Sequence, residues 1–163
     1  MLNNHLNFFV WMCRALHIFS AVGWIGGIGF LNGVASPIFT YLGDGSKDTR
    51  LRLQQRFIGY VWTCVWGLLV SGVILMLMSG KFLWFDFSDT WRVLLLVKQV
   101  FFLVMVAASL IISRSLKDIV SAETTLDAGQ DISEYDIIEW RINTLNKLNM
   151  LCGIIAILLA AAM

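Results

Sequence analysis

The chain has 163 residues, of which 58% are hydrophobic and only 14% are charged. This balance excludes an ordinary soluble globular domain and favours an integral membrane protein, with the lipid bilayer as its surroundings. The net charge of +1 argues against nucleic acid as a partner, because no basic stripe is present to neutralise phosphates.

Four stretches are long and apolar enough to cross a hydrocarbon core, which takes about 20 residues in a helix. They cover residues 8–42, 57–80, 91–113 and 142–163. The first has no basic start or cleavage site of a signal peptide, so we expect it to stay in the membrane as a helix. The sequence therefore predicts a single membrane domain over residues 1–163, an all-α four-helix bundle.

The positive charges predict how this bundle is oriented. We call side A the end that holds both termini and the 81–90 loop, and side B the end that holds the 43–56 and 114–141 connections. Side B carries most of the basic residues, namely Lys47, Arg50, Arg52, Arg56, Arg114, Lys117, Arg141 and Lys147, against Arg14, Lys81 and Arg92 on side A. Because basic loops stay in the cytoplasm, both termini are expected outside. The 114–141 segment is expected to be a cytoplasmic loop with short surface helices.

The first apolar stretch is longer than one crossing requires, so it is expected to tilt, with Pro37 bending or ending it near side B. It also carries two GxxxG pairs, Gly23 with Gly27 and Gly29 with Gly33. Small residues at this spacing let another backbone or a flat ligand approach closely. Helix packing and ligand binding are both open at these positions.

Two ionisable side chains, His17 and Lys98, fall inside the predicted membrane helices. Such residues cost roughly 2.5 to 3.5 kcal/mol to insert, which makes them candidates for function. At the helical rise, His17 lies roughly 13 Å from the side A end of its helix and Lys98 roughly 10 Å from the start of its own. The two residues are therefore predicted to share the side A leaflet.

Imidazole is a common ligand of haem iron, copper and zinc, and a lysine at the same depth could neutralise a porphyrin propionate. His17 as a metal ligand and Lys98 as a cofactor-binding residue thus predict a pocket for haem b or another porphyrin. Arg14, one turn before His17, is also placed to meet an anionic group. The alternatives are a neutral His17 that donates to a carbonyl of a neighbouring helix and a Lys98 that extends to the interface.

A second ligand for the same iron has several possible sources. His5 lies roughly 18 Å from His17 along the helix, too far to bind the other face of one haem. Met76 or Met78, at the side A end of the second helix, could supply a sulfur ligand, as could water, Lys98 or a partner chain.

Three asparagines recur at every third position of the last helix: Asn143, Asn146 and Asn149. Their amides can hydrogen-bond across helices. The alternative is a polar path or a contact with a quinone.

The string LHIFSAVGWIGG in the first helix resembles the start of CopD-type membrane domains and of the related HemJ-type protoporphyrinogen oxidases, which open with a histidine followed by a tryptophan and glycines. RFIGYVWTCVWGLLVSGVILM resembles the second helix of that group, LLLVKQVFFLVMVAASLI its lysine-bearing third, and RINTLNKLNMLCGIIAILLAA its last. The resemblance implies a four-helix membrane fold in which His17 and Lys98 match residues tied to haem or porphyrin. It also points to Trp24 and Gly27 as cofactor-binding residues.

The residues and the resemblance together predict a b-type cytochrome in the bacterial inner membrane, an electron-transfer subunit of a larger complex. Its expected partners are other membrane or periplasmic redox subunits, or a second copy of the chain. The first alternative, implied by CopD-like proteins, is copper transport or resistance, with a copper ion bound by His17 and Met76. The second alternative is a HemJ-like protoporphyrinogen oxidase.

Overall fold

The computed structural model of the chain describes residues 2–78, 90–125 and 132–161, all of them helical apart from a single residue between two helices. In chain order the elements are α1 (Leu2–Phe30), the π-helical turn η1 (Leu31–Ala35), α2 (Ser36–Leu42), the 3-10 turn η2 (Asp44–Ser46), α3 (Lys47–Met78), α4 (Thr90–Thr125) and α5 (Ile132–Ala161). The predicted 81–90 loop lies outside the described residues except for its last residue.

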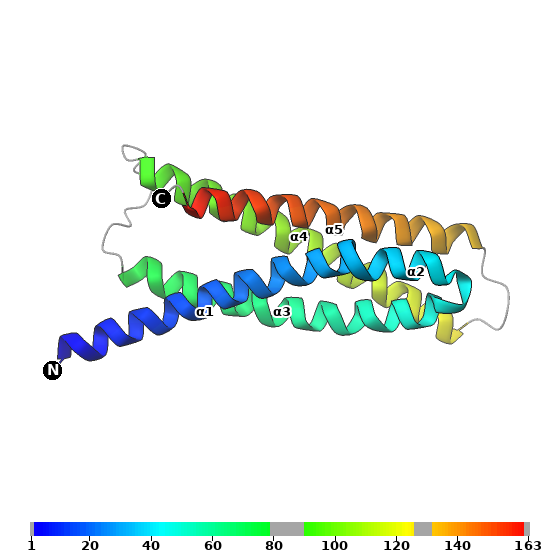
Figure 1. Cartoon of the computed structure of the whole chain (residues 1–163), viewed down its shortest axis with the longest axis horizontal. Helices are drawn as coiled ribbons and strands as arrows, with labels where there is room; N and C mark the ends of the chain where they lie inside the picture. The colour runs from blue at the N-terminus through cyan, green and yellow to red at the C-terminus, as the bar shows by residue number, and fades with distance from the viewer. Residues whose placement is uncertain (1, 79–89, 126–131, 162–163) are drawn as a thin grey trace.

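The helices form an elongated bundle (Figure 1). Going round the bundle, α1 packs against α3, α3 against α4, α4 against α5, and α5 against α1. The start of α1 and the end of α5 lie at one end, which is side A, and the turn between α2 and α3 lies at the other end, side B. The arrangement of the two ends is therefore the one predicted.

Within the described residues, four helical stretches are long and apolar enough to cross a membrane: His5–Leu42, Lys47–Met78, Arg92–Ile119 and Ile137–Ala161. Large apolar side chains such as Phe19, Trp66 and Leu103 are exposed on the outside of the bundle. Lipid tails are as apolar as these side chains, so such exposure suits a bilayer. The prediction of an all-α protein with four such helices is confirmed.

The helices extend further than the apolar stretches that predicted them. The third element, α3, begins at Lys47 rather than at residue 57, and the predicted 114–141 loop is helical up to Thr125 and again from Ile132. Residues 126–131 of that loop lie outside the described residues. Lys, Arg, Gln, Glu and Leu are good helix formers, so a helix can continue past its apolar part. Hydropathy marks only the part that crosses the membrane.

Pro37 disturbs the first helical stretch without ending it. Proline has no N–H to donate to the carbonyl four residues back, and its ring crowds that carbonyl. The turn just before it, η1, is π-helical, and Ser36 donates its N–H to the carbonyl of Leu31. The stretch ends instead at Gly43, whose φ of 69° suits glycine.

The core has two parts, both built from apolar side chains. One surrounds Trp24 in the middle of the bundle and includes Ile28, Val61, Cys64, Val65, Met105 and Cys152. The other lies nearer side B and consists of Leu51, Ile112, Leu116 and Ile142. The side A end, where His17 lies, is outside both clusters.

Candidate functional site

His17 on α1 is half-buried and pairs with a side chain of α3. Its Nδ1 lies 2.9 Å from Oγ of Ser71, and Ser71 is fully buried, with 0% exposure. The Ser71 hydroxyl donates to the carbonyl of Gly67 at 2.5 Å. A hydroxyl has only one proton to donate, so Ser71 must accept the proton of His17 Nδ1. This assigns the tautomer of His17 and leaves a lone pair on Nε2.

A glycine of α3 makes room for the imidazole. A Cβ at Gly72 would lie only 3.2 Å from Cε1 of His17, so a larger residue there would push the ring away from Ser71. Neither Ser71 nor Gly72 was singled out from the sequence. The signal was available, because a serine next to a glycine in an otherwise apolar helix, near the depth of His17, is a candidate partner.

Lys98 on α4 lies within electrostatic range of His17. Its side chain is half-buried and makes no hydrogen bond or ion pair with any described residue. The structure thus brings together the two ionisable residues that topology alone placed in one leaflet. The imidazole of His17, which also takes part in a hydrogen bond with the backbone of Leu68, and the ammonium of Lys98, which pairs with no described residue, share the side A end of the bundle.

Met76 and Arg14 are the other two candidates at this end of the bundle. Met76 Sδ accepts a hydrogen bond from Nε2 of Gln99 at 3.7 Å, which joins α3 to α4 beside Lys98. Arg14 is exposed on the surface of α1.

Trp24 and Gly27 are part of the helix packing. Trp24 is 1% exposed, and its ring meets Phe102 edge-on, with 6.1 Å between ring centroids and 87° between planes. A Cβ at Gly27 would lie 2.5 Å from Cε2 of Phe57. Gly27 therefore lets Phe57 of α3 approach α1, and that aromatic ring fills the space.

The two GxxxG pairs have different surroundings. Gly23 faces Tyr60 and Cys64 of α3, as Gly27 faces Phe57, whereas a Cβ at Gly29 or Gly33 would meet nothing within 4 Å. The first pair is a helix-packing motif. The second pair, Gly29 of α1 and Gly33 of η1, has open space beside it.

Two of the three asparagines that recur along α5, Asn143 and Asn149, make hydrogen bonds to other helices. Asn149 Nδ2 donates to Oγ of Ser109 on α4 at 3.2 Å, and Asn143 Oδ1 accepts from Arg50 of α3 at 3.3 Å. The prediction of interhelical hydrogen bonds is confirmed at these two positions.

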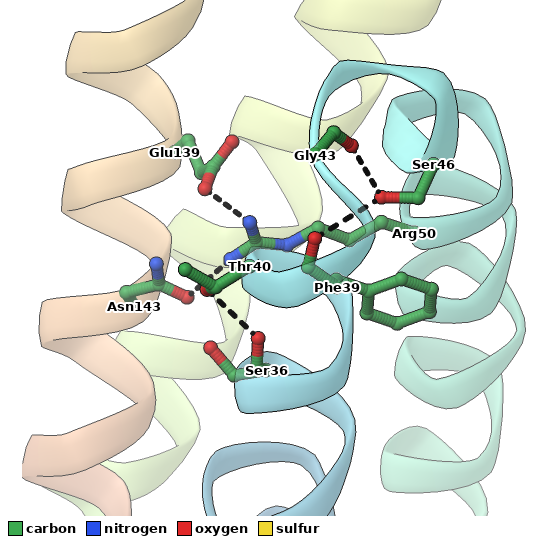
Figure 2. Close-up of polar contacts among 8 residues, drawn as sticks. All are labelled: Ser36, Phe39, Thr40, Gly43, Ser46, Arg50, Glu139 and Asn143. Carbon is green, nitrogen blue, oxygen red and sulfur yellow. Dashed lines mark hydrogen bonds and ion pairs between the residues drawn. The ribbon is translucent and has the colours of Figure 1, made fainter.

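A charged cluster at side B was not predicted as a unit. Arg50 of α3 donates to the carboxylate of Glu139 and to the amide oxygen of Asn143, both on α5 (Figure 2). The side chains of Arg50 and Glu139 are only 12% and 25% exposed. Beside them, the hydroxyl of Ser46 lies 2.7 Å from the carbonyl oxygen of Gly43 and 3.2 Å from that of Phe39, and it closes the turn between α2 and α3. The Arg50 contacts join α3 to α5 at this end.

Glu139→Ala is expected to lower the free energy of unfolding by about 1–3 kcal/mol, because it leaves the largely buried Arg50 without its carboxylate. The matched control is Asp48→Ala, which removes the carboxylate of the exposed Arg52–Asp48 pair and should cost less than about 1 kcal/mol. Denaturant or thermal unfolding of the purified protein measures both. Equal losses would show that Arg50 is not held by Glu139.

The described residues contain no group of three or more His, Cys, Asp or Glu that could hold a metal ion. Among the described residues, His17 therefore belongs to no such group. No family model, no curated protein and no solved structure matches the chain. The resemblance to CopD-type and HemJ-type proteins stays a prediction.

Proposed function

We propose that this protein is a b-type haem-binding integral membrane protein that passes electrons as a subunit of a larger membrane complex. In this proposal Nε2 of His17 would bind the iron. The observation that supports it most is the hydrogen bond from His17 Nδ1 to Ser71. Metal-ligating histidines have this arrangement, in which the second ring N–H is held by an oxygen and the tautomer is fixed.

The donors at side A fit a porphyrin iron better than a bare ion. A porphyrin brings four nitrogens of its own, so one or two protein ligands suffice, whereas bare copper or zinc needs several from the protein. His17 supplies one, and the ammonium of Lys98, which has no partner among the described residues, would offset a propionate charge. Haem bound there would supply one-electron redox chemistry.

The proposal includes a placement in the membrane. The distribution of Lys and Arg favours a cytoplasmic side B, so His17 and Lys98 would lie in the outer leaflet of a bacterial inner membrane. Electrons would then be exchanged with membrane or periplasmic redox subunits, or with a second copy of the chain. Met76, water or such a partner would complete the coordination of the iron.

The test is the spectrum and metal content of protein purified from haem-sufficient cells. The proposal expects a Soret band, a b-type reduced-minus-oxidised spectrum and iron in proportion to porphyrin. Stoichiometric copper without porphyrin would overturn it in favour of a CopD-like role. Turnover of a porphyrinogen that is lost in Lys98→Met would overturn it in favour of a HemJ-like oxidase.

Ser71→Ala is expected to weaken haem binding by about 10–100-fold, because it removes the partner that fixes the tautomer of His17. Ser113→Ala is the control, since Ser113 hydrogen-bonds Trp62 rather than His17. Titration of haem into both apoproteins measures the change, and Ser71→Thr, which keeps the hydroxyl, should restore most of the affinity. An unchanged affinity in Ser71→Ala would show that this hydrogen bond does not serve the ligand.

A further inference from the structure

Two small cavities adjoin inside the side B half of the bundle. The inner cavity is enclosed by the second core and by polar side chains that include Trp24, Ser109 and Asn149. The outer cavity lies between α2, α3 and α5 and reaches Arg50. Leu31, Gln54 and Asn146 line both, so the two cavities meet at an amide-lined boundary.

Two buried polar atoms on the inner cavity have no partner among the described residues. They are Nε1 of Trp24 and Oδ1 of Asn149, and both residues are 1% exposed. Leaving such groups unpaired costs about 1–3 kcal/mol each. One is a donor and the other an acceptor, so a water molecule can accept from Trp24 and donate to Asn149.

The size of the two cavities indicates which molecule can occupy them. Each has room for about one water molecule, which is too little for a quinone ring. The lining of the inner cavity is mainly apolar, and the polar side chains on it, among them Trp24 and Asn149, supply the roughly 2–4 hydrogen-bonding partners that an internal water needs. Gln54 and Asn146 supply amides where the two cavities meet.

We infer that the two cavities form a half-channel for water, which enters from side B beside the Arg50–Glu139 ion pair and ends at Trp24 inside the membrane. The amides of Asn143, Asn146 and Gln54 line its course, and Trp24 and Asn149 bind the innermost water.

Apolar packing closes the inner end of the half-channel. At Trp24 the half-channel meets the first core, where Phe102, Cys64 and Met105 pack with Trp24. His17 precedes Trp24 by seven residues of α1, which places it roughly 10 Å nearer to side A at the helical rise. Water from side B therefore reaches the bundle interior while the His17 end stays separated from it.

Water-edited NMR of the full-length ¹⁵N-labelled protein in lipid bilayers tests this inference, with or without a cofactor bound. The indole N–H of Trp24 should receive magnetisation from water severalfold faster than that of Trp62, which is bonded to Ser113 Oγ at 3.1 Å. Trp24→Phe and Trp62→Phe assign the two signals. A Trp24 signal that builds up no faster than that of Trp62 would overturn the half-channel.

A second measurement tests the route. Asn146→Leu replaces an amide shared by both cavities with an apolar side chain, and it should slow water transfer to Trp24 severalfold while leaving Trp62 unchanged. Gln54→Leu changes the other shared amide and replaces Asn146→Leu if that variant does not fold. Unchanged transfer to Trp24 in the folded variant would show that water does not arrive from side B. Neither result depends on haem, so the half-channel and the proposed function can fail separately.

Discussion

His17→Ala is expected to abolish haem binding, with the haem-to-protein ratio of the purified protein falling by more than about tenfold. Loss of a partner of a ligand already costs about 10–100-fold in affinity, and the chain's only other histidine, His5, lies at the very start of the first apolar stretch. The reduced-minus-oxidised spectrum of membranes and the haem content of purified protein measure the loss.

The matched control is His5→Ala, which removes the chain's other histidine. His5 is exposed near the start of α1, so its loss should leave the spectrum and the haem content unchanged. A second control separates ligation from folding, because imidazole added to His17→Gly should restore haem binding to a protein that has kept its fold. If His17→Ala retains its haem, His17 is not the ligand.

Gly27→Leu is expected to destabilise the bundle by about 1–3 kcal/mol relative to Gly29→Leu. Both changes gain the same helix propensity, about 1 kcal/mol over glycine. Only Gly27 has a neighbour in the way, because a Cβ there would lie 2.5 Å from Phe57, whereas Gly29 has nothing within 4 Å. The difference between the two variants therefore isolates the packing of α1 on α3.

Thermal unfolding of the two variants in the same detergent measures this difference. Haem content, measured on the same samples, decides between the two roles proposed for Gly27. Equal stabilities with haem lost only in Gly27→Leu would contradict the packing role and favour contact with a flat ligand.

The membrane-crossing parts of the fold could be predicted because lipid imposes a length and an apolar composition on each helix. The ends of the helices could not be predicted in this way, because residues such as Lys47 and Arg52 continue α3 beyond its apolar part. Pro37 was correctly identified as a disturbance, but the π turn that accommodates it depends on backbone geometry that a residue pattern does not specify.

The candidate site was partly predictable for the same reason. Depth along each helix placed His17 and Lys98 in one leaflet, and their electrostatic proximity in the structure follows from helices of similar orientation. The partner of His17 could not be deduced, because Ser71 is 54 residues away and its pairing depends on how α1 and α3 are rotated against each other. Likewise, Gly27 in an apolar helix indicates that another group approaches α1 closely, but the sequence does not show that this group is the Phe57 ring.

Coordination of haem iron by Nε2 of His17 is the central claim, and pulsed electron paramagnetic resonance of the oxidised protein tests it most directly. In protein labelled with ¹⁵N-histidine, we expect an iron-bound imidazole nitrogen whose signal is lost in His17→Ala and retained in His5→Ala. Bound haem with no coupled histidine nitrogen, or with a coupled nitrogen that survives in His17→Ala, would contradict it.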